Sequence, residues 1–237
     1  MTTSDAWRAV LSSHSHKDRF YGVVIGVVTN NQDPDNMHRI KVRFPWLDED
    51  IESNWARVAA PMAGKDRGAY FLPEVDDEVL IAFEHGQVDH PYVIGSLWNG
   101  KDEAPESNSD GENNNRTIKS RSGHELRFHD KSGSEKIEII SQSGHQLRLD
   151  DKSGNETIEV IDKSGSNKII IDTANNSITI EAKSDITIKS STGKLTMQAA
   201  SGIEMKSQAG VSIQAASSMD LKAGAQVTVK GAMIKLN

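Results

Sequence analysis

The sequence contains no cysteine among its 237 residues, and this absence excludes disulfide bonds and thiolate metal sites. Aromatic residues make up 5% and hydrophobic residues 36%, which is little for a conventional globular core. No stretch approaches eighteen consecutive apolar residues, and residues 1–18 are mostly polar. We therefore expect neither a membrane-spanning helix nor a signal peptide, and synthesis in a reducing cytoplasm.

Positive charge is scarce in the first half of the chain. Residues 1–115 contain 10 Lys and Arg against 20 Asp and Glu, whereas residues 116–237 contain 17 against 14. An acidic first half repels a phosphate backbone, and the small basic excess of the second half does not favour a DNA or membrane partner. We expect no nucleic-acid partner.

Catalytic motifs are also missing. The sequence has no Gly-x-Ser-x-Gly elbow, no His-Glu-x-x-His zinc motif and no phosphate loop. Residues 101–116 carry several carboxylates, but a segment so rich in Ser, Asn, Gly and Pro favours a linker over a catalytic pocket. We expect no enzyme activity and no cofactor. The carboxylates are Asp102, Glu103, Glu106, Asp110 and Glu112.

Repetition is what the sequence has in abundance. From about residue 177 an apolar–polar–apolar triplet returns roughly every eight residues. Residues two apart point to the same side of a strand, so each triplet places its apolar pair inward and its middle residue outward. Such a short period indicates a β-solenoid. Its predicted core consists of Ile178, Ile180, Ile186, Ile188, Leu195, Met197, Ile203, Met205, Val211, Ile213, Met219, Leu221, Val227 and Val229.

The number of triplets bears on assembly. They would make only about two turns of a triangular single-chain solenoid, fewer than the about three repeats that a continuous core needs. Three chains wound about one axis would close the sheets and triple the number of strands over the same height. We predict an intertwined homotrimeric β-helix over residues 117–237; a single-chain β-helix stacked on the upstream repeats is the alternative.

A longer repeat precedes the triplets. The segment 122–133, SGHELRFHDKSG, recurs twenty-one residues later as SGHQLRLDDKSG at 143–154, and a degenerate third copy begins at Ser164. Each copy holds two alternating segments, for example Glu125–His129 and Lys136–Ile140, separated by a Lys-Ser-Gly turn. These copies predict paired strands.

Residues 20–100 contain five or six short apolar or alternating segments and no helical period, which predicts a small closed barrel of the OB type. Residues 1–19 are treated as a leader arm. The first predicted strand carries Gly22 and Gly26, which permit the bend that a small barrel requires. The predicted strands are Tyr21–Thr29, Arg39–Phe44, Trp55–Ala60, Gly68–Leu72, Glu78–Phe83 and Pro91–Leu97.

Several of these segments, in their order and spacing, resemble the OB-fold domain of the VgrG and phage baseplate-V spike proteins. One departure is Asp76, where that family commonly has glycine. With the β-helix, the resemblance covers about residues 20–237. It is carried by Gly26 to Pro34, Arg39 to Trp46, Trp55 to Val58, Pro73 to Gly86 and Pro91 to Gly100.

The resemblance implies an all-β fold, with an OB barrel at 20–100, a linker at 101–116 and the trimeric spike at 117–237. It implies the central spike of a contractile injection machine: a phage tail, tailocin, type VI secretion system or extracellular injection particle. The location would be the virion or particle baseplate, assembled in the bacterial cytoplasm. A trimmed VgrG that carries effectors is the alternative, because the family's hub module is not recognised in this sequence.

Three partners besides the chain's own copies follow from the resemblance: a PAAR-type tip protein, a baseplate hub protein and, transiently, the target cell envelope. The chain ends on an apolar strand without a polar cap, which invites contact with a tip protein; completion of the core alone is the equal alternative. We expect Trp7 and Leu11, four residues apart, to share a helical face that docks on the hub. The expected tip contacts are Ala232, Met233, Ile234 and Leu236.

Two further kinds of site compete with plainer interpretations. In the family a His-x-His pair can bind iron at the tip, but this chain has no histidine after His145, and we expect no metal site. His14 and His16 have the spacing but lie at the other end of the chain. Ligand binding by the OB barrel through a basic and aromatic stripe is disfavoured against packing within the trimer. That stripe comprises Arg39, Lys41 and Arg43, with Phe44 and Trp46 nearby.

Overall fold

The computed structural model describes residues 19–47 and 51–235. Strands dominate, and the described residues contain no α-helix, only the short 3₁₀ turn η2 (Glu84–Gly86). No helix in this described part is long and apolar enough to cross a membrane. The chain divides into two units, residues 1–183 and residues 184–237. The prediction of an all-β chain is confirmed.

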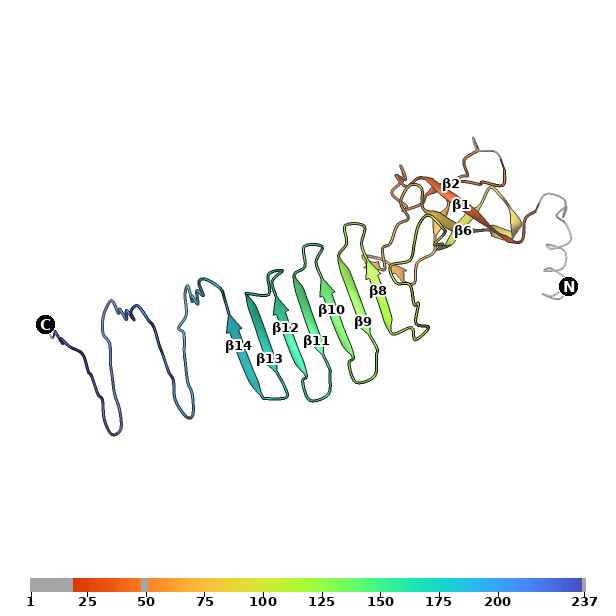
Figure 1. The fold of residues 1–237 in the computed structure, drawn as a ribbon. Coiled ribbons are helices and arrows are strands. Elements are labelled where there is room, and N and C mark those ends of the chain that lie inside the picture. Colours follow the sequence, from red (N-terminus) through yellow and green to blue (C-terminus); the bar gives the residue numbers. More distant parts are fainter. Residues whose placement is uncertain (1–18, 48–50, 236–237) are drawn as a thin grey trace, which may run out of the picture. The chain divides into compact units, whose positions relative to one another are not determined.

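Five strands of the first unit form one curled sheet in the order β2-β1-β6-β7-β3 (Figure 1). Its neighbouring strands are antiparallel except β3 and β7, which are parallel. The strands are β1 (Val23–Asn30), β2 (Lys41–Arg43), β3 (Arg57–Val58), β6 (Glu78–Phe83) and β7 (Pro91–Ser96). All five lie within or beside predicted segments. The prediction of a strand at 68–72 is wrong in extent, because β5 (Arg67–Gly68) pairs only with β4 (Ala63–Gly64).

Alternation along these strands buries one face of the sheet. In β6 every second residue is buried. The other buried core residues come from β1, β2 and β7 and from Ile40, Phe44 and Ala56 beside the strands. Gly26 lets β1 cross this core closely, because a Cβ atom there would lie 3.1 Å from Val42 Cγ2 and 3.2 Å from Ile81 Cγ1. The core consists of Val24, Val28, Ile40, Val42, Phe44, Ala56, Val79, Ile81, Phe83 and Val93.

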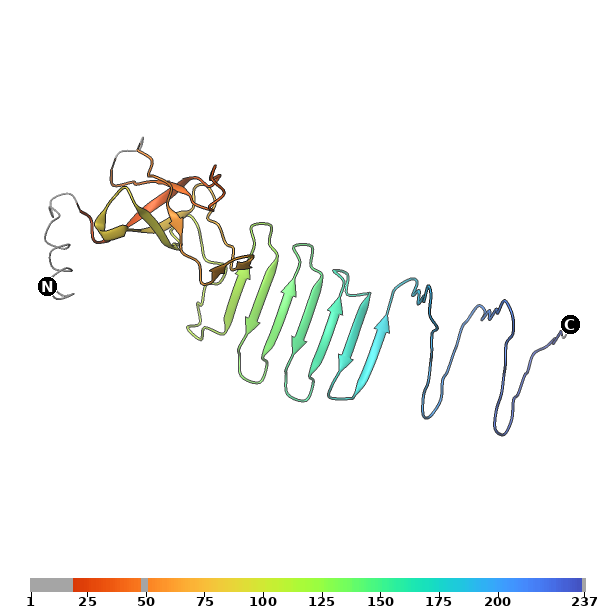
Figure 2. The same cartoon turned by 180° about the vertical axis from the view of Figure 1, so that it is seen from behind.

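Seven further strands form a second sheet in which each strand pairs antiparallel with the next along the chain (Figures 1 and 2). The sequence predicted two of them residue for residue, at 125–129 and 136–140. Glycines at positive φ, such as Gly123 and Gly144, occupy the connecting turns. The strands are β8 (Asn115–Lys119), β9 (Glu125–His129), β10 (Lys136–Ile140), β11 (Gln146–Asp150), β12 (Thr157–Ile161), β13 (Lys168–Asp172) and β14 (Ser177–Glu181).

The second unit, unlike the first, has no regular secondary structure among its described residues. Its described residues, 184–235, form no strand, and all of them are exposed. Of the predicted apolar triplets, only Ile178–Ile180 lies in a strand, β14 of the first unit. The six later triplets belong to the predicted core shared by three chains, so one chain does not test that assignment, and it stays a prediction.

Candidate functional site: an uncovered apolar sheet face

The two faces of the seven-stranded sheet differ in chemistry. Successive side chains of a strand point to opposite faces, so the second and fourth residues of each five-residue strand share one face. From β9 to β14 all of these residues are apolar, and we call this set the apolar face. It comprises Leu126, Phe128, Ile137, Ile139, Leu147, Leu149, Ile158, Val160, Ile169, Ile171, Ile178 and Ile180.

The apolar face is exposed in the single chain. Ile139 is 52% exposed, Val160 50% and Ile178 70%, and most other members of the set also keep more than a third of their surface in contact with solvent. A contiguous apolar surface of this extent marks an interaction site, because monomeric proteins rarely leave one open. The arrangement therefore calls for further protein to cover it.

The opposite face carries charged side chains that form ion pairs within the chain. Arg127, Glu138, Arg148 and Glu159 occupy the middle positions of four adjacent strands and are paired in register. Arg148 donates from Nε to Glu138 at 3.0 Å and from Nη1 to Glu159 at 3.1 Å. Glu138 is only 5% exposed, so this charge is held among cationic neighbours, including Lys136 at 3.3 Å. The charges of this ladder are thus paired within the chain, although the buried Nε of Arg127 has no hydrogen-bond partner.

Histidines of the repeat connect successive turns of the sheet. His124 Nδ1 accepts the backbone N–H of Gln142 at 3.1 Å, and His145 Nδ1 accepts that of Lys163 at 3.2 Å. In the third copy Asn167 Oδ1 accepts the N–H of Lys183 at 3.0 Å. An accepting Nδ1 carries no proton, so this geometry requires the neutral ring. We call these three hydrogen bonds, accepted by His124, His145 and Asn167, the turn clamps. They were not predicted from the sequence, although the recurrence of Ser-Gly-His was a signal for the two histidines.

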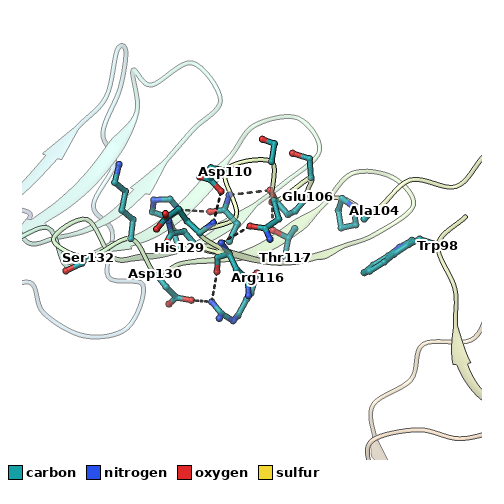
Figure 3. A pocket seen from close by; sticks show the side chains of 18 residues that line it. Trp98, Ala104, Glu106, Asp110, Arg116, Thr117, His129, Asp130 and Ser132 are labelled. Carbon is teal, nitrogen blue, oxygen red and sulfur yellow. Dashed lines mark hydrogen bonds and ion pairs between the residues drawn. The ribbon is translucent and has the colours of Figure 1, made fainter. Parts of the chain in front are cut away.

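The predicted linker packs on the start of the second sheet (Figure 3). Glu106 accepts hydrogen bonds from Thr117 Oγ1 at 2.6 Å and from Asn115 Nδ2 at 3.3 Å, and lies 3.7 Å from Arg127 Nε. A cavity of about 1000 Å³ lies between this segment and the β8–β9 strands. Among the described residues no three His, Asp or Glu side chains gather as metal ligands would.

The basic stripe of the OB barrel is largely occupied by its own neighbours. Arg39 holds Asp33 with two hydrogen bonds, Nε–Oδ2 at 2.7 Å and Nη2–Oδ1 at 2.8 Å, and so lowers the pKa of that carboxyl well below its usual range. Lys41 pairs with Glu52 at 3.1 Å. Phe44 is buried in the core at 3% exposure. Two of the three cations of the stripe are therefore already paired, and one of its two rings cannot stack on a base.

The remaining predicted contact residues fall into two groups. Met233 and Ile234 are exposed, at 75% and 51%, and Ala232 is exposed beside them. Leu236, Trp7 and Leu11 lie outside the described residues, as do His14 and His16. The tip and hub contacts thus stay predictions.

Comparison with known proteins agrees with this geometry. Residues 24–98 match the family described as Type VI secretion system/phage-baseplate injector OB domain. The curled five-stranded sheet with its buried face is thus an injector OB domain. Three spike proteins, VgrG3, VgrG1a and VgrG5, are similar to part of this chain.

The similar spike proteins come from two organisms. VgrG3 of Vibrio cholerae is 33% identical over 111 residues, which cover 44% of this chain and 11% of that protein. VgrG1a of Pseudomonas aeruginosa is 30% identical over 129 residues, covering 49% and 20%. VgrG5 of the same bacterium is 32% identical over 126 residues, covering 48% and 16%. The matched part of this chain thus spans between about a tenth and a fifth of the length of these relatives.

Proposed function

We propose that this chain is the central spike of a contractile injection machine. Three copies would form a rigid needle that carries a tip protein at its C-terminal end, meets a hub protein at its N-terminal end and is driven through the target envelope. The observation that supports this function best is the apolar face, which is exposed in one chain while the opposite face has its charges paired. The similar proteins are themselves spike proteins, which also supports this proposal.

Burial of the apolar face would supply the stability that such a part needs. At about 25 cal/mol per Å², each half-exposed Ile or Leu gains about 1 kcal/mol when it is fully covered. The twelve side chains of the face would then contribute on the order of 10 kcal/mol per chain, as an upper value. Three sheets enclose a triangular interior without leaving an apolar face open.

The apolar pairs of the triplets beyond β14 would also be buried between the three chains. Each triplet offers a pair of apolar side chains, and all of these pairs are exposed in one chain, from 47% at Met219 to 71% at Leu221. Strands from two further chains would satisfy their backbone groups and cover their side chains. Chains wound about each other separate only when many such units open together, so the rod would transmit axial load as a passive part, without enzyme activity.

A second arrangement keeps the same spike within a longer protein. The relatives extend far beyond the matched region, since only 11% to 20% of their length is covered. In that arrangement the chain would be a segment of a type VI VgrG that also carries effectors. Both arrangements require the trimeric spike.

Binding of a PAAR-repeat tip protein tests the carrier role. Met233→Asp together with Ile234→Asp should weaken this binding at least about tenfold, because two apolar contacts per chain become charged. Thr228→Asp, at a middle position of a triplet that faces outward in the proposed rod, is the matched control and should leave binding unchanged. The readout is tip-protein capture by the purified trimer, with its mass checked by light scattering. Equal capture by all three proteins would contradict the proposed tip contact.

A further inference from the structure

The OB sheet has a second apolar surface, on the side away from its core. Val23 and Ile25 of β1 pair with Ala82 and Leu80 of β6. Ile94 of β7 lies at a register shift, next to Gly95, which is the partner of Leu80. Val23, Ile25 and Ile94 are 55%, 45% and 46% exposed. We call Val23, Ile25, Leu80, Ala82 and Ile94 the barrel patch. It contains no charged side chain.

Charged and polar groups lie next to the barrel patch on two sides. On the β7 side, Arg57 lies over the ring of Tyr92 at 5.7 Å, and the Tyr92 hydroxyl donates to Glu84 at 3.3 Å. At the other end, Val27 pairs with Arg43 of β2 and with Glu78 of β6. The barrel patch is thus a neutral area on a domain whose acidic residues outnumber its basic ones.

We propose that the barrel patch is where three copies of this OB domain meet around the axis of the spike. This inference rests on the proposed trimer. Residues 1–115 carry 20 acidic against 10 basic residues, so three such domains repel each other wherever charged surfaces face. A neutral apolar patch is the surface on which identical acidic domains approach at the least electrostatic cost, and it gains apolar burial.

Because each barrel is connected to the second sheet, a small patch is sufficient to hold the three barrels in contact. The segment between barrel and sheet is fastened at Glu106 to Asn115 and Thr117. Arg121, in the first turn of the second sheet, pairs with Glu74 of the barrel at 2.8 Å. In a trimeric spike the three barrels are therefore tethered at the same end, at an effective concentration of about millimolar. A contact that would be too weak to hold free domains together then forms within the trimer.

Cysteine cross-linking tests the inference cleanly, because the chain has no cysteine of its own. Ile25→Cys and Ile94→Cys are made separately in the full chain and treated with a short bis-maleimide at low protein concentration. Each should give a cross-linked dimer that contains about two thirds of the chains, since the third cysteine of a trimer finds no partner. Met62→Cys, also apolar and 54% exposed but outside the barrel patch, is the control and should react without cross-linking.

The outcomes separate this inference from the proposed function. A light-scattering mass of one chain would overturn both. A trimeric mass without cross-links in Ile25→Cys or Ile94→Cys, or with cross-links in the Met62→Cys control, would overturn the barrel contact and leave the spike intact. Cysteines that react freely in the trimer and become protected only when a baseplate protein is added would overturn it too, and would assign the barrel patch to that other protein. Ile94→Asp should retain the trimeric mass yet abolish cross-linking through Ile25→Cys.

Discussion

Asp76 of the OB domain stands where the family that the sequence resembles commonly has glycine, and the structure gives the reason why aspartate is tolerated there. Asp76 has φ 77°, in the left-handed region that glycine adopts at no steric cost. It lies in the turn before β6, where its N–H donates to Val28 O at 2.9 Å. Aspartate is among the few side chains that occupy this region readily.

Substitutions of Asp76 test this account of the turn. Asp76→Gly should change the stability of the barrel by less than about 0.5 kcal/mol, since relief of the backbone offsets the added chain entropy. Asp76→Val should cost more than about 1 kcal/mol, because a β-branched residue is strained at positive φ. All four tryptophans lie within the first 100 residues, so tryptophan fluorescence on heating reports this domain. Equal melting of the two variants would contradict the account.

A carboxylate in the turn after β12 should make the stability of the second sheet depend on pH. The pKa of Asp162 is lowered to about 2, because its carboxylate accepts hydrogen bonds from the Asn167 backbone N–H and the Ser164 hydroxyl. The folded pKa lies below the ordinary value of 3.8, so this carboxylate stabilises the fold above about pH 4 and ceases to do so as the pH falls through about 2. Asp162→Asn should therefore lower the melting temperature at pH 7 and make little difference at pH 2. Circular dichroism provides the comparison; an equal difference at both pH values would contradict it.

The turn clamps act at the scale of elements, because each joins one hairpin turn to the next. His145→Ala removes the acceptor of the Lys163 N–H and should cost about 0.5–1 kcal/mol per chain, which is modest because that N–H is exposed. His145→Asn should retain most of the stability, since Asn167 plays this part in the following repeat. Thermal unfolding of the two variants measures the difference. Identical losses for the two variants would show that the hydrogen bond contributes nothing.

Two adjacent residues of β13 separate the two faces of the sheet. Ile171 belongs to the apolar face and is 36% exposed, whereas Ile170 lies on the charged face, opposite Glu159. In an isolated sheet Ile171→Asp would be the milder change, because Ile170 is the less exposed of the two and already has an acidic neighbour. In the proposed trimer Ile171→Asp buries three charges at the axis and should prevent assembly, while Ile170→Asp should leave a trimer. Size-exclusion chromatography with light scattering distinguishes the two, and assembly of both variants would exclude a shared apolar interior.

Local patterns predicted much of the fold. The strands at 125–129 and 136–140 followed from alternation and from their Lys-Ser-Gly turn, because both signals lie within a few residues of each other. The charged ladder and the turn clamps did not follow, since they depend on which residues face each other across strands. The triplets after β14 are a further case, because a core shared among copies is not visible in one chain.

At the scale of the whole molecule, the apolar face, the triplets and the barrel patch are among the apolar surfaces that one chain leaves exposed. These three lie on the parts proposed to form the spike. Three identical copies around one axis would cover all of them. The same axis would bring together three acidic N-terminal halves at one end, where the barrel patch offers a neutral contact. Trimeric assembly is thus the proposition on which the spike function and the barrel contact both depend.

The mass of the purified 237-residue chain in solution tests this proposition most directly. Light scattering coupled to size exclusion should give three times the chain mass of 25.9 kDa, at all concentrations at which the protein can be measured. A well-folded particle of 25.9 kDa would contradict the account, because the apolar face would then remain exposed in the native protein.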